Sequence, residues 1–288
     1  PQELRLIARA SPRAVYGLLM RSAVASLQAV LSSQYQARFA ITAVLHTWTR
    51  EMLFHPHVHV VVSAGGLSLD DRRWVQTGTS FLVSTRKLAP LFRGKLLSSL
   101  RKVRNNGDLV LVDPLASQWE SVLNKAAGKT WVIHVEPPQR RSPGTLLKYL
   151  ARYVFRVAID DRRVVAHDGH TVTIRTRGKA TTTMTGETFV RCFVQHAVPK
   201  GLRKVRYYGL LAPSNVGTRL TRAFELLGTT RPRPADASPA PDPTCDPTDD
   251  REPRRRCPNC GQRAIELWRL APQRGPPAAQ ETRQRRAS

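Results

Sequence analysis

The feature that most limits the fold of this chain is a change in composition near residue 229. Residues 229–288 contain 11 of the 21 prolines, and proline lacks the backbone donor that helices and sheets require. The long hydrophobic runs with helical or strand periodicity all lie before this point. We therefore expect residues 1–228 to fold, and residues 229–288 to form a linker and tail rich in proline and arginine.

The net charge of the chain indicates what kind of partner it binds. The chain of 288 residues has 46 Lys and Arg against 21 Asp and Glu, a net charge of +25, and 41% of its residues are hydrophobic. The tail holds 12 of the basic and 8 of the acidic residues, so most of the excess belongs to the part that folds. Such a charge attracts polyanions, and nucleic acid is the most common of these. A solubility device or a ribosome-associated protein is the alternative interpretation.

Neither a membrane nor a disulfide framework is expected. No stretch approaches the roughly 20 uninterrupted apolar residues of a membrane-spanning helix, and the N-terminus has no signal-peptide pattern. The four cysteines are too few for a disulfide scaffold and suit a reducing compartment. These observations predict a cytoplasmic protein without a membrane partner.

Hydrophobic periodicity predicts an α+β fold with a mainly antiparallel sheet flanked by helices. A hairpin is expected around the turn at Asp168 and Gly169, and Gly65-Gly66 is expected to end the second strand. The predicted helices cover residues 13–32, 86–103, 142–157 and 187–196, and the predicted strands cover residues 37–47, 58–62, 131–135, 163–166, 171–175 and 181–184.

The densest polar cluster is His55-Pro56-His57-Val58-His59. His57 and His59 are two residues apart, so on a strand both imidazoles project from the same face. Two imidazoles on one face can clamp a divalent ion. Histidines that are simply hydrogen-bonded or exposed are the alternative reading of such a pair.

A second constellation lies in the predicted helix over residues 142–157. Tyr149 and Tyr153 are four residues apart, so their hydroxyl groups can reach the same volume. A phenol can attack phosphorus when nearby positive charge offsets its pKa of about 10. Lys148, Arg152 and Arg156 are close enough in sequence to supply that charge and to contact DNA. Two half-buried tyrosines packed on a sheet are the alternative.

Several motifs in order resemble those of one family. His46-Thr47-Trp48, the histidine cluster, Gly65-Gly66-Leu67 and the segment from Lys148 to Ile159 are similar to the motifs of rolling-circle insertion-sequence transposases, which belong to the two-tyrosine HUH nuclease superfamily. The run from Glu187 to Gly209 continues this similarity, which covers roughly residues 38–215. The resemblance implies an HUH-nuclease-like catalytic domain over residues 37–228, preceded by a helical segment over residues 1–36.

The resemblance implies a transposase that nicks and transfers single-stranded DNA. His57 and His59 would hold Mg²⁺ or Mn²⁺, and Tyr149 and Tyr153 would form 5′-phosphotyrosine esters. The sequence has no Gly-x-x-x-x-Gly-Lys-[Ser/Thr] loop for nucleotide-driven unwinding, so a host helicase or other replication protein is an expected partner. We expect action near the bacterial nucleoid, with Trp48 and Tyr207 stacking on unpaired bases.

Such sites usually have a third metal ligand. Glu51 is our prediction, because a carboxylate suits a hard, oxygen-preferring cation. His55 is the rival, and an imidazole would shift the preference toward softer metals. His46 and His196 are expected to be hydrogen-bonded framework histidines.

The tail contains a possible zinc site. Cys257 and Cys260 form a Cys-x-x-Cys knuckle, but a structural zinc needs four ligands and Cys245 is the only further cysteine nearby. A degenerate ribbon without zinc, or Zn²⁺ completed by Cys245 and a water or another chain, remain open.

The beginning of the chain departs from the family. It begins at Pro1, and residues 1–36 lack the cysteine-rich module that such transposases carry before the catalytic domain. We expect an N-terminally truncated form. A replication initiator of plasmids or phages, or a non-catalytic repressor that binds element ends, are the other readings.

Overall fold

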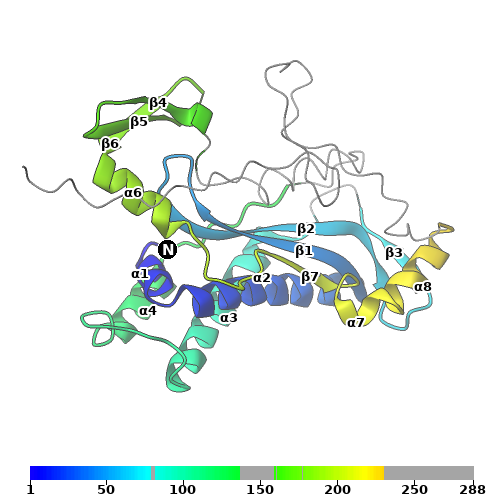
Figure 1. Cartoon of the computed structure of the whole chain (residues 1–288). Coiled ribbons are helices and arrows are strands. Elements are labelled where there is room, and N and C mark those ends of the chain that lie inside the picture. Colours follow the sequence, from blue (N-terminus) through cyan, green and yellow to red (C-terminus); the bar gives the residue numbers. More distant parts are fainter. Residues whose placement is uncertain (79–81, 137–158, 160, 177, 230–288) are drawn as a thin grey trace, which may run out of the picture. The chain divides into compact units, whose positions relative to one another are not determined.

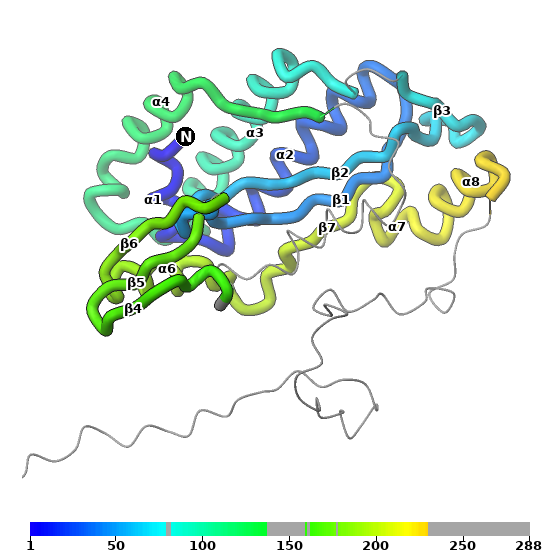
Figure 2. Tube along the Cα trace, turned by 90° about the horizontal axis from the view of Figure 1, so that it is seen from above, coloured from blue at the N-terminus to red at the C-terminus, as the bar shows by residue number. Residues whose placement is uncertain are grey.

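The computed structural model describes residues 1–78, 82–136, 159, 161–176 and 178–229, and all of them belong to one compact unit, Pro1–Arg231. This unit combines two antiparallel sheets with helices (Figures 1 and 2), which confirms the α+β expectation. Its helices are α1 (Glu3–Ala10), α2 (Pro12–Tyr35), α3 (Thr85–Asn105), α4 (Trp119–Gly128), α6 (Gly186–Gln195), α7 (Pro213–Val216) and α8 (Arg219–Leu226). Its strands are β1 (Ala37–Trp48), β2 (Phe54–Ser68), β3 (Trp74–Gln76), β4 (Val164–His167), β5 (Thr171–Arg175), β6 (Thr181–Thr185) and β7 (Val205–Gly209).

The larger sheet has the order β3-β2-β1-β7, and each neighbouring pair is antiparallel. Alternate residues of β1 face the core, because successive side chains of a strand point to opposite faces. The intervening positions carry Thr42 and His46 on the other face of the sheet. The buried set is Ala37, Phe39, Ile41, Ala43 and Leu45.

Helix α2 covers the core face of this sheet (Figure 1). It begins with Pro12 in its first turn, where a missing backbone donor costs nothing, and it ends at Gln36 in the left-handed conformation. By length and composition it is the one helix of the described residues that would suffice to cross a membrane, but 67% of its apolar window is buried inside the fold. The first 36 residues therefore contribute to the same core as the sheet.

The second sheet is a small meander, β4-β5-β6, followed by α6. The expected turn is present: Asp168 Oδ1 accepts hydrogen bonds from the backbone amides of His170 and Thr171, and Gly169 has a φ of +88°. Thr185 caps α6 by accepting a hydrogen bond from the Thr188 amide. The connection from α6 to β7 returns the chain to the larger sheet.

Two strand predictions are wrong. Strand β2 does not stop at Gly65-Gly66 but continues to Ser68. A Cβ on Gly66 would lie 2.8 Å from the carbonyl oxygen of Arg38, so glycine permits close pairing with β1 rather than ending the strand. Residues 131–135 are not a strand. Trp131 instead packs against Phe92 and donates a hydrogen bond to the carbonyl oxygen of Ala126.

The predicted helices over residues 13–32, 86–103 and 187–196 are confirmed as α2, α3 and α6. The predicted helix over residues 142–157 lies outside the described residues, as does the tail beyond residue 229. Periodicity did not reveal α1, α4, α7, α8 or the short strands β3 and β7.

Candidate metal centre

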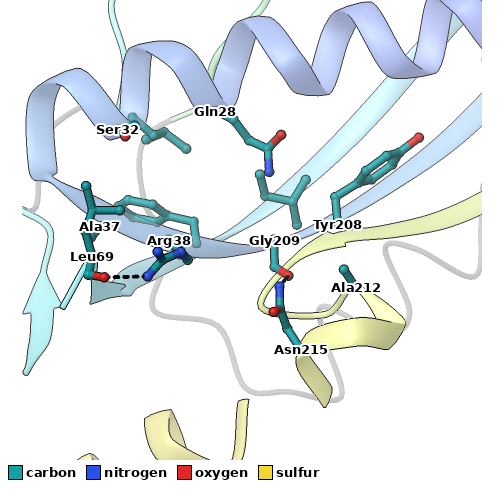
Figure 3. A pocket seen from close by; sticks show the side chains of 12 residues that line it. Gln28, Ser32, Ala37, Arg38, Leu69, Tyr208, Gly209, Ala212 and Asn215 are labelled. Carbon is teal, nitrogen blue, oxygen red and sulfur yellow. Dashed lines mark hydrogen bonds between the residues drawn. The ribbon is translucent and has the colours of Figure 1, made fainter. Parts of the chain in front are cut away.

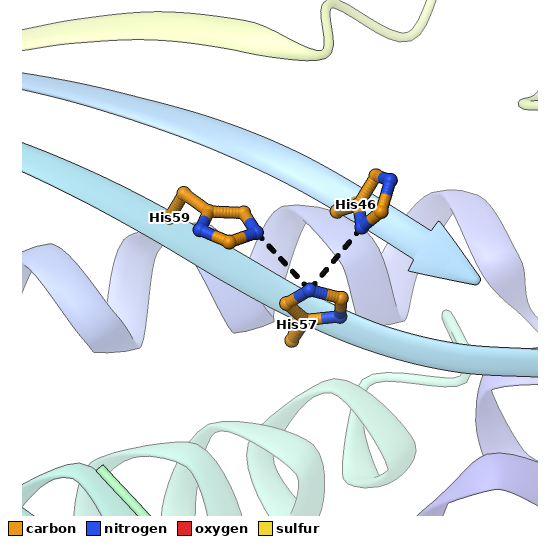
Figure 4. A group of neighbouring side chains, drawn as sticks. All are labelled: His46, His57 and His59. Atoms are coloured by element: carbon orange, nitrogen blue, oxygen red, sulfur yellow. Dashed lines mark hydrogen bonds between the residues drawn. The ribbon is translucent and has the colours of Figure 1, made fainter. Parts of the chain in front are cut away.

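Three histidines meet on the face of the larger sheet that is turned away from α2. In the β1–β2 pairing His46 is directly opposite His57, and Val44 is opposite His59. Directly opposed residues project from the same face, and so do residues two apart on one strand. The three imidazoles therefore converge (Figure 4), and one nitrogen from each forms a group whose atoms all lie within 4.8 Å of one another.

Hydrogen bonding fixes the tautomer of the central ring. His57 Nδ1 lies 2.6 Å from the carbonyl oxygen of His55, and a carbonyl only accepts, so this nitrogen carries the proton. The lone pair of His57 is then on Nε2, which faces His46 Nδ1 at 3.2 Å and His59 Nε2 at 3.1 Å. A metal-binding histidine usually makes a hydrogen bond of this kind with the ring nitrogen that does not bind the metal, and this bond orients the ring.

The electrostatics keep these rings neutral. Burial, followed by the neighbouring imidazoles, lowers the pKa of His46 from 6.5 to about 3. Burial, followed by His57, lowers the pKa of His59 to about 4. Burial also lowers the pKa of His57, although its hydrogen bond to the His55 carbonyl opposes that shift. A neutral imidazole can donate a ring-nitrogen lone pair to a metal, so the donor set fits a divalent cation at neutral pH.

Packing around the group holds it in place. The Trp48 ring is 4.2 Å from that of His46 and 5.4 Å from that of His196, measured between centroids. His196 is buried and its Nε2 donates to the carbonyl oxygen of Met52 at 3.1 Å, which agrees with the framework role expected for it. Trp48 is only 6% exposed, so the expectation that it stacks on DNA bases is wrong.

The third member of the group differs from our prediction. Glu51 lies in the connection between β1 and β2 and is not part of the group of three, whereas His46 is. His46 belongs to the group because β-pairing places it directly opposite His57. The rival, His55, is exposed and accepts a hydrogen bond from Arg5 of α1 at its Nδ1, and its backbone carbonyl orients His57.

Tyr149 and Tyr153, with the basic residues Lys148, Arg152 and Arg156, lie outside the described residues, and so do Cys257 and Cys260. These assignments stay predictions.

A separate hollow of about 490 Å³ lies beside the opposite end of β1, between α2 and the β7–α7 turn (Figure 3). Gly209 forms its floor, and its φ is +60°. A Cβ there would lie 1.9 Å from the carbonyl oxygen of Phe39, so only glycine fits this turn. The hollow contains no histidine and is separate from the metal centre.

The low pKa values predict that acid destabilises the fold. Below pH 6.5 a histidine in the unfolded chain takes up a proton, whereas His46 and His59 remain neutral in the native state until about pH 3 and 4. The unfolded state then binds more protons, so stability falls as the pH decreases from about 6.5 toward 4. Urea unfolding between pH 7.5 and 4.5 measures this, and His59→Gln should make the decline shallower. An equally steep decline of stability in that variant would contradict the lowered pKa of His59.

The comparisons with known proteins agree with the transposase resemblance that the sequence motifs indicate. The family profile Y2_Tnp, described as "Putative transposase", matches residues 40–218. The chain is 33% identical over 281 residues to the "Putative transposase y4qJ" of Sinorhizobium fredii, with 91% of this chain and 69% of that protein covered. It is 31% identical over 211 residues to the transposase for insertion sequence element IS801 of Pseudomonas savastanoi pv. phaseolicola, with 68% and 49% covered.

The chain thus spans about half the length of the IS801 transposase. No solved structure matches this chain. The profile covers more than half of the chain and includes all three histidines of the metal centre. The chain therefore belongs to the Y2_Tnp family of insertion-sequence transposases.

Proposed function

We propose that this transposase is a metal-dependent endonuclease and strand transferase for single-stranded DNA in rolling-circle transposition. The observation that supports this most directly is the convergence of His46, His57 and His59 on an open sheet face. Three neutral imidazoles that present one nitrogen each to a common point form a donor set that suits a divalent cation. A cation bound there would be held by rings from both neighbouring strands.

The ligands would be His46 Nδ1, His57 Nε2 and His59 Nε2. When bound, the cation would polarise the scissile phosphate and neutralise charge on it during attack. An all-imidazole set is softer than the histidine and carboxylate set predicted first, so we expect Mn²⁺ to be preferred over Mg²⁺. The Cys257–Cys260 pair remains a separate candidate for Zn²⁺.

The nucleophile would be Tyr149 or Tyr153. The phenol oxygen attacks the phosphorus and loses its proton to solvent or a nearby base. The bond from phosphorus to the 3′ oxygen breaks, and that oxygen takes up a proton, leaving a 3′-hydroxyl and a 5′-phosphotyrosine. One phosphodiester replaces another, so rejoining by the reverse attack needs no ATP. Lys148, Arg152 and Arg156 would hold the DNA backbone.

The sheet offers a route for the strand. Tyr207 of β7 pairs with Thr42 of β1 on the same face as the histidines, and its side chain is 56% exposed. Thr42 precedes His46 by four residues, which is about 13 Å along a strand. Base stacking on Tyr207 would therefore align a single strand over the sheet toward the metal centre.

The test is a covalent adduct. The purified chain is incubated with a labelled single-stranded oligonucleotide from the element end and either Mn²⁺ or Mg²⁺, and is then analysed on a denaturing gel. We expect a metal-dependent adduct that disappears when EDTA is added first. A duplex of the same sequence is the control and should give little adduct. Cleavage without any covalent protein–DNA product would contradict the tyrosine mechanism.

A further inference from the structure

We propose that the outer face of helix α3 binds the backbone of double-stranded DNA, forming a second DNA surface separate from the metal centre. The proposal rests on the chain acting on DNA, as its family indicates, and not on the nicking chemistry. It starts from the charge of α3, whose 21 residues include seven Lys and Arg and no Asp or Glu.

Three of the seven basic residues have structural partners. Arg93 donates to the carbonyl oxygen of Ala127, and Arg101 forms an ion pair with Glu120 at 3.1 Å. Arg104 donates to the carbonyl oxygen of Ala116, and its guanidinium lies over the Trp119 ring. These arginines fasten α3 to α4 and to the segment before it, so their charge is explained by the fold.

The three lysines of α3 form a stripe whose charge is not explained by contacts within the fold. Lys87, Lys95 and Lys102 are exposed, and none has a hydrogen-bond or ion-pair partner among the residues that the structure describes. The spacings of eight and seven residues place them within an arc of about 80°, separated along the axis by about 12 and 10 Å. We call these three residues the α3 lysine stripe.

The stripe faces away from the metal centre. Leu96 and Leu100 of α3 are buried in the core formed with α2 and the larger sheet, and the stripe lies on the opposite side of the helix from them. The histidines occupy the sheet face that α2 does not cover. The stripe and the metal centre therefore cannot contact the same short stretch of DNA.

The first turn of α3 adds a second argument. It contains Arg86 and Lys87 and no acidic residue, although the positive end of the helix dipole disfavours cations there. A groove of about 410 Å³ adjoins Lys87 and is lined by Ser33, Gln34 and Leu91 among others. A phosphate docked beside this turn would neutralise both cations and accept hydrogen bonds from the polar groups of the groove.

Double-stranded DNA fits this surface better than the other polyanions. A helix that carries point charges over about 22 Å suits a rigid duplex, whose phosphates hold fixed positions. A flexible single strand would gain less from a rigid array. A membrane surface would need an apolar face next to the basic one, and the apolar face of α3 is already buried in the core. The duplex next to the nicked strand, or the target duplex, would be the natural occupant.

The test compares two triple variants of the full chain. In the stripe variant Lys87, Lys95 and Lys102 are changed to Gln, and binding to a 20-base-pair duplex is measured by fluorescence anisotropy at several salt concentrations. Each lost phosphate contact lowers the slope of log K against log salt by about 0.9. We expect the slope to decrease in magnitude by about 2 to 3, with weaker binding at low salt.

The matched control removes the same charge elsewhere. Lys125, Lys129 and Lys179 are also exposed and unpartnered among the described residues, and their change to Gln should leave the duplex slope within about 1 of the parent. Equal losses in both variants, or no loss in the stripe variant, would overturn the proposal. Both variants should still form the metal-dependent adduct on a single-stranded oligonucleotide. If the nuclease proposal is wrong, the adduct will be missing in the parent chain as well, which distinguishes its failure from failure of the duplex-binding proposal.

Discussion

Replacing His57 by alanine is expected to abolish metal-dependent cleavage. His57 is the central ring, since its Nε2 lies 3.2 Å from His46 Nδ1 and 3.1 Å from His59 Nε2. Without it, two imidazoles remain on different strands and cannot fix a cation or the phosphate. Loss of even an outer hydrogen bond to a ligand costs about 10–100-fold in metal affinity, so we expect a loss above about 100-fold here. Calorimetric titration with Mn²⁺ and the adduct assay both measure it.

His55→Ala is the matched control, because it removes an imidazole from the same strand. The carbonyl oxygen of residue 55, which orients His57, is retained in that variant. The Arg5–His55 contact is lost, but it lies outside the group of three, so Mn²⁺ affinity should change by less than about 10-fold. Parental cleavage by His57→Ala, or complete loss in His55→Ala, would show that a different set of residues binds the metal.

The third ligand is tested by a similar pair. His46→Ala should weaken Mn²⁺ binding by more than about 10-fold, whereas Glu51→Gln should leave it nearly unchanged, since Glu51 is outside the group. The opposite result would restore the carboxylate that the sequence first indicated.

Much of the fold follows from sequence periodicity, and the miss at His46 shows where that reasoning stops. The spacing of His57 and His59 places both on one face, because this is a local property of any strand. The partner on the neighbouring strand depends on register, which the connection between β1 and β2 determines. A hairpin centred near residue 51 pairs residues whose numbers sum to about 103, and His46 with His57 satisfies this. The signal was therefore present in the sequence.

Other misses have different physical causes. Strand β7 is short and apolar only in part, and it exists because β1 supplies its partner from more than 150 residues earlier. Such long-range pairing leaves little trace in local sequence. Residues 131–135 have a strand-like composition, but Trp131 buries its ring against Phe92 instead of pairing in a sheet. A glycine pair such as Gly65-Gly66 is typical of a strand end, but here the missing side chain allows the close approach of β1.

Changing both Tyr149 and Tyr153 to phenylalanine is expected to eliminate the covalent adduct. Phenylalanine keeps the ring and its packing but removes the only oxygen that can attack the phosphate, so adduct yield should fall by more than about 1,000-fold, the scale of losing a nucleophile. DNA binding, measured by anisotropy, should stay within about 3-fold, because the basic residues around the tyrosines are unchanged. Each single variant should keep one half of the cleavage and joining cycle.

Tyr207→Phe is the matched control for this pair. Tyr207 is an exposed tyrosine on the histidine-bearing face, and its proposed role uses the ring and not the hydroxyl group, so the adduct yield should not change. Normal rejoining of cleaved strands by the double variant would contradict the two-tyrosine mechanism. Loss of the adduct in Tyr207→Phe would instead move the nucleophile from residues 149 and 153 to β7. Because the metal centre is common to both outcomes, these variants separate the question of which group attacks from the question of what holds the phosphate.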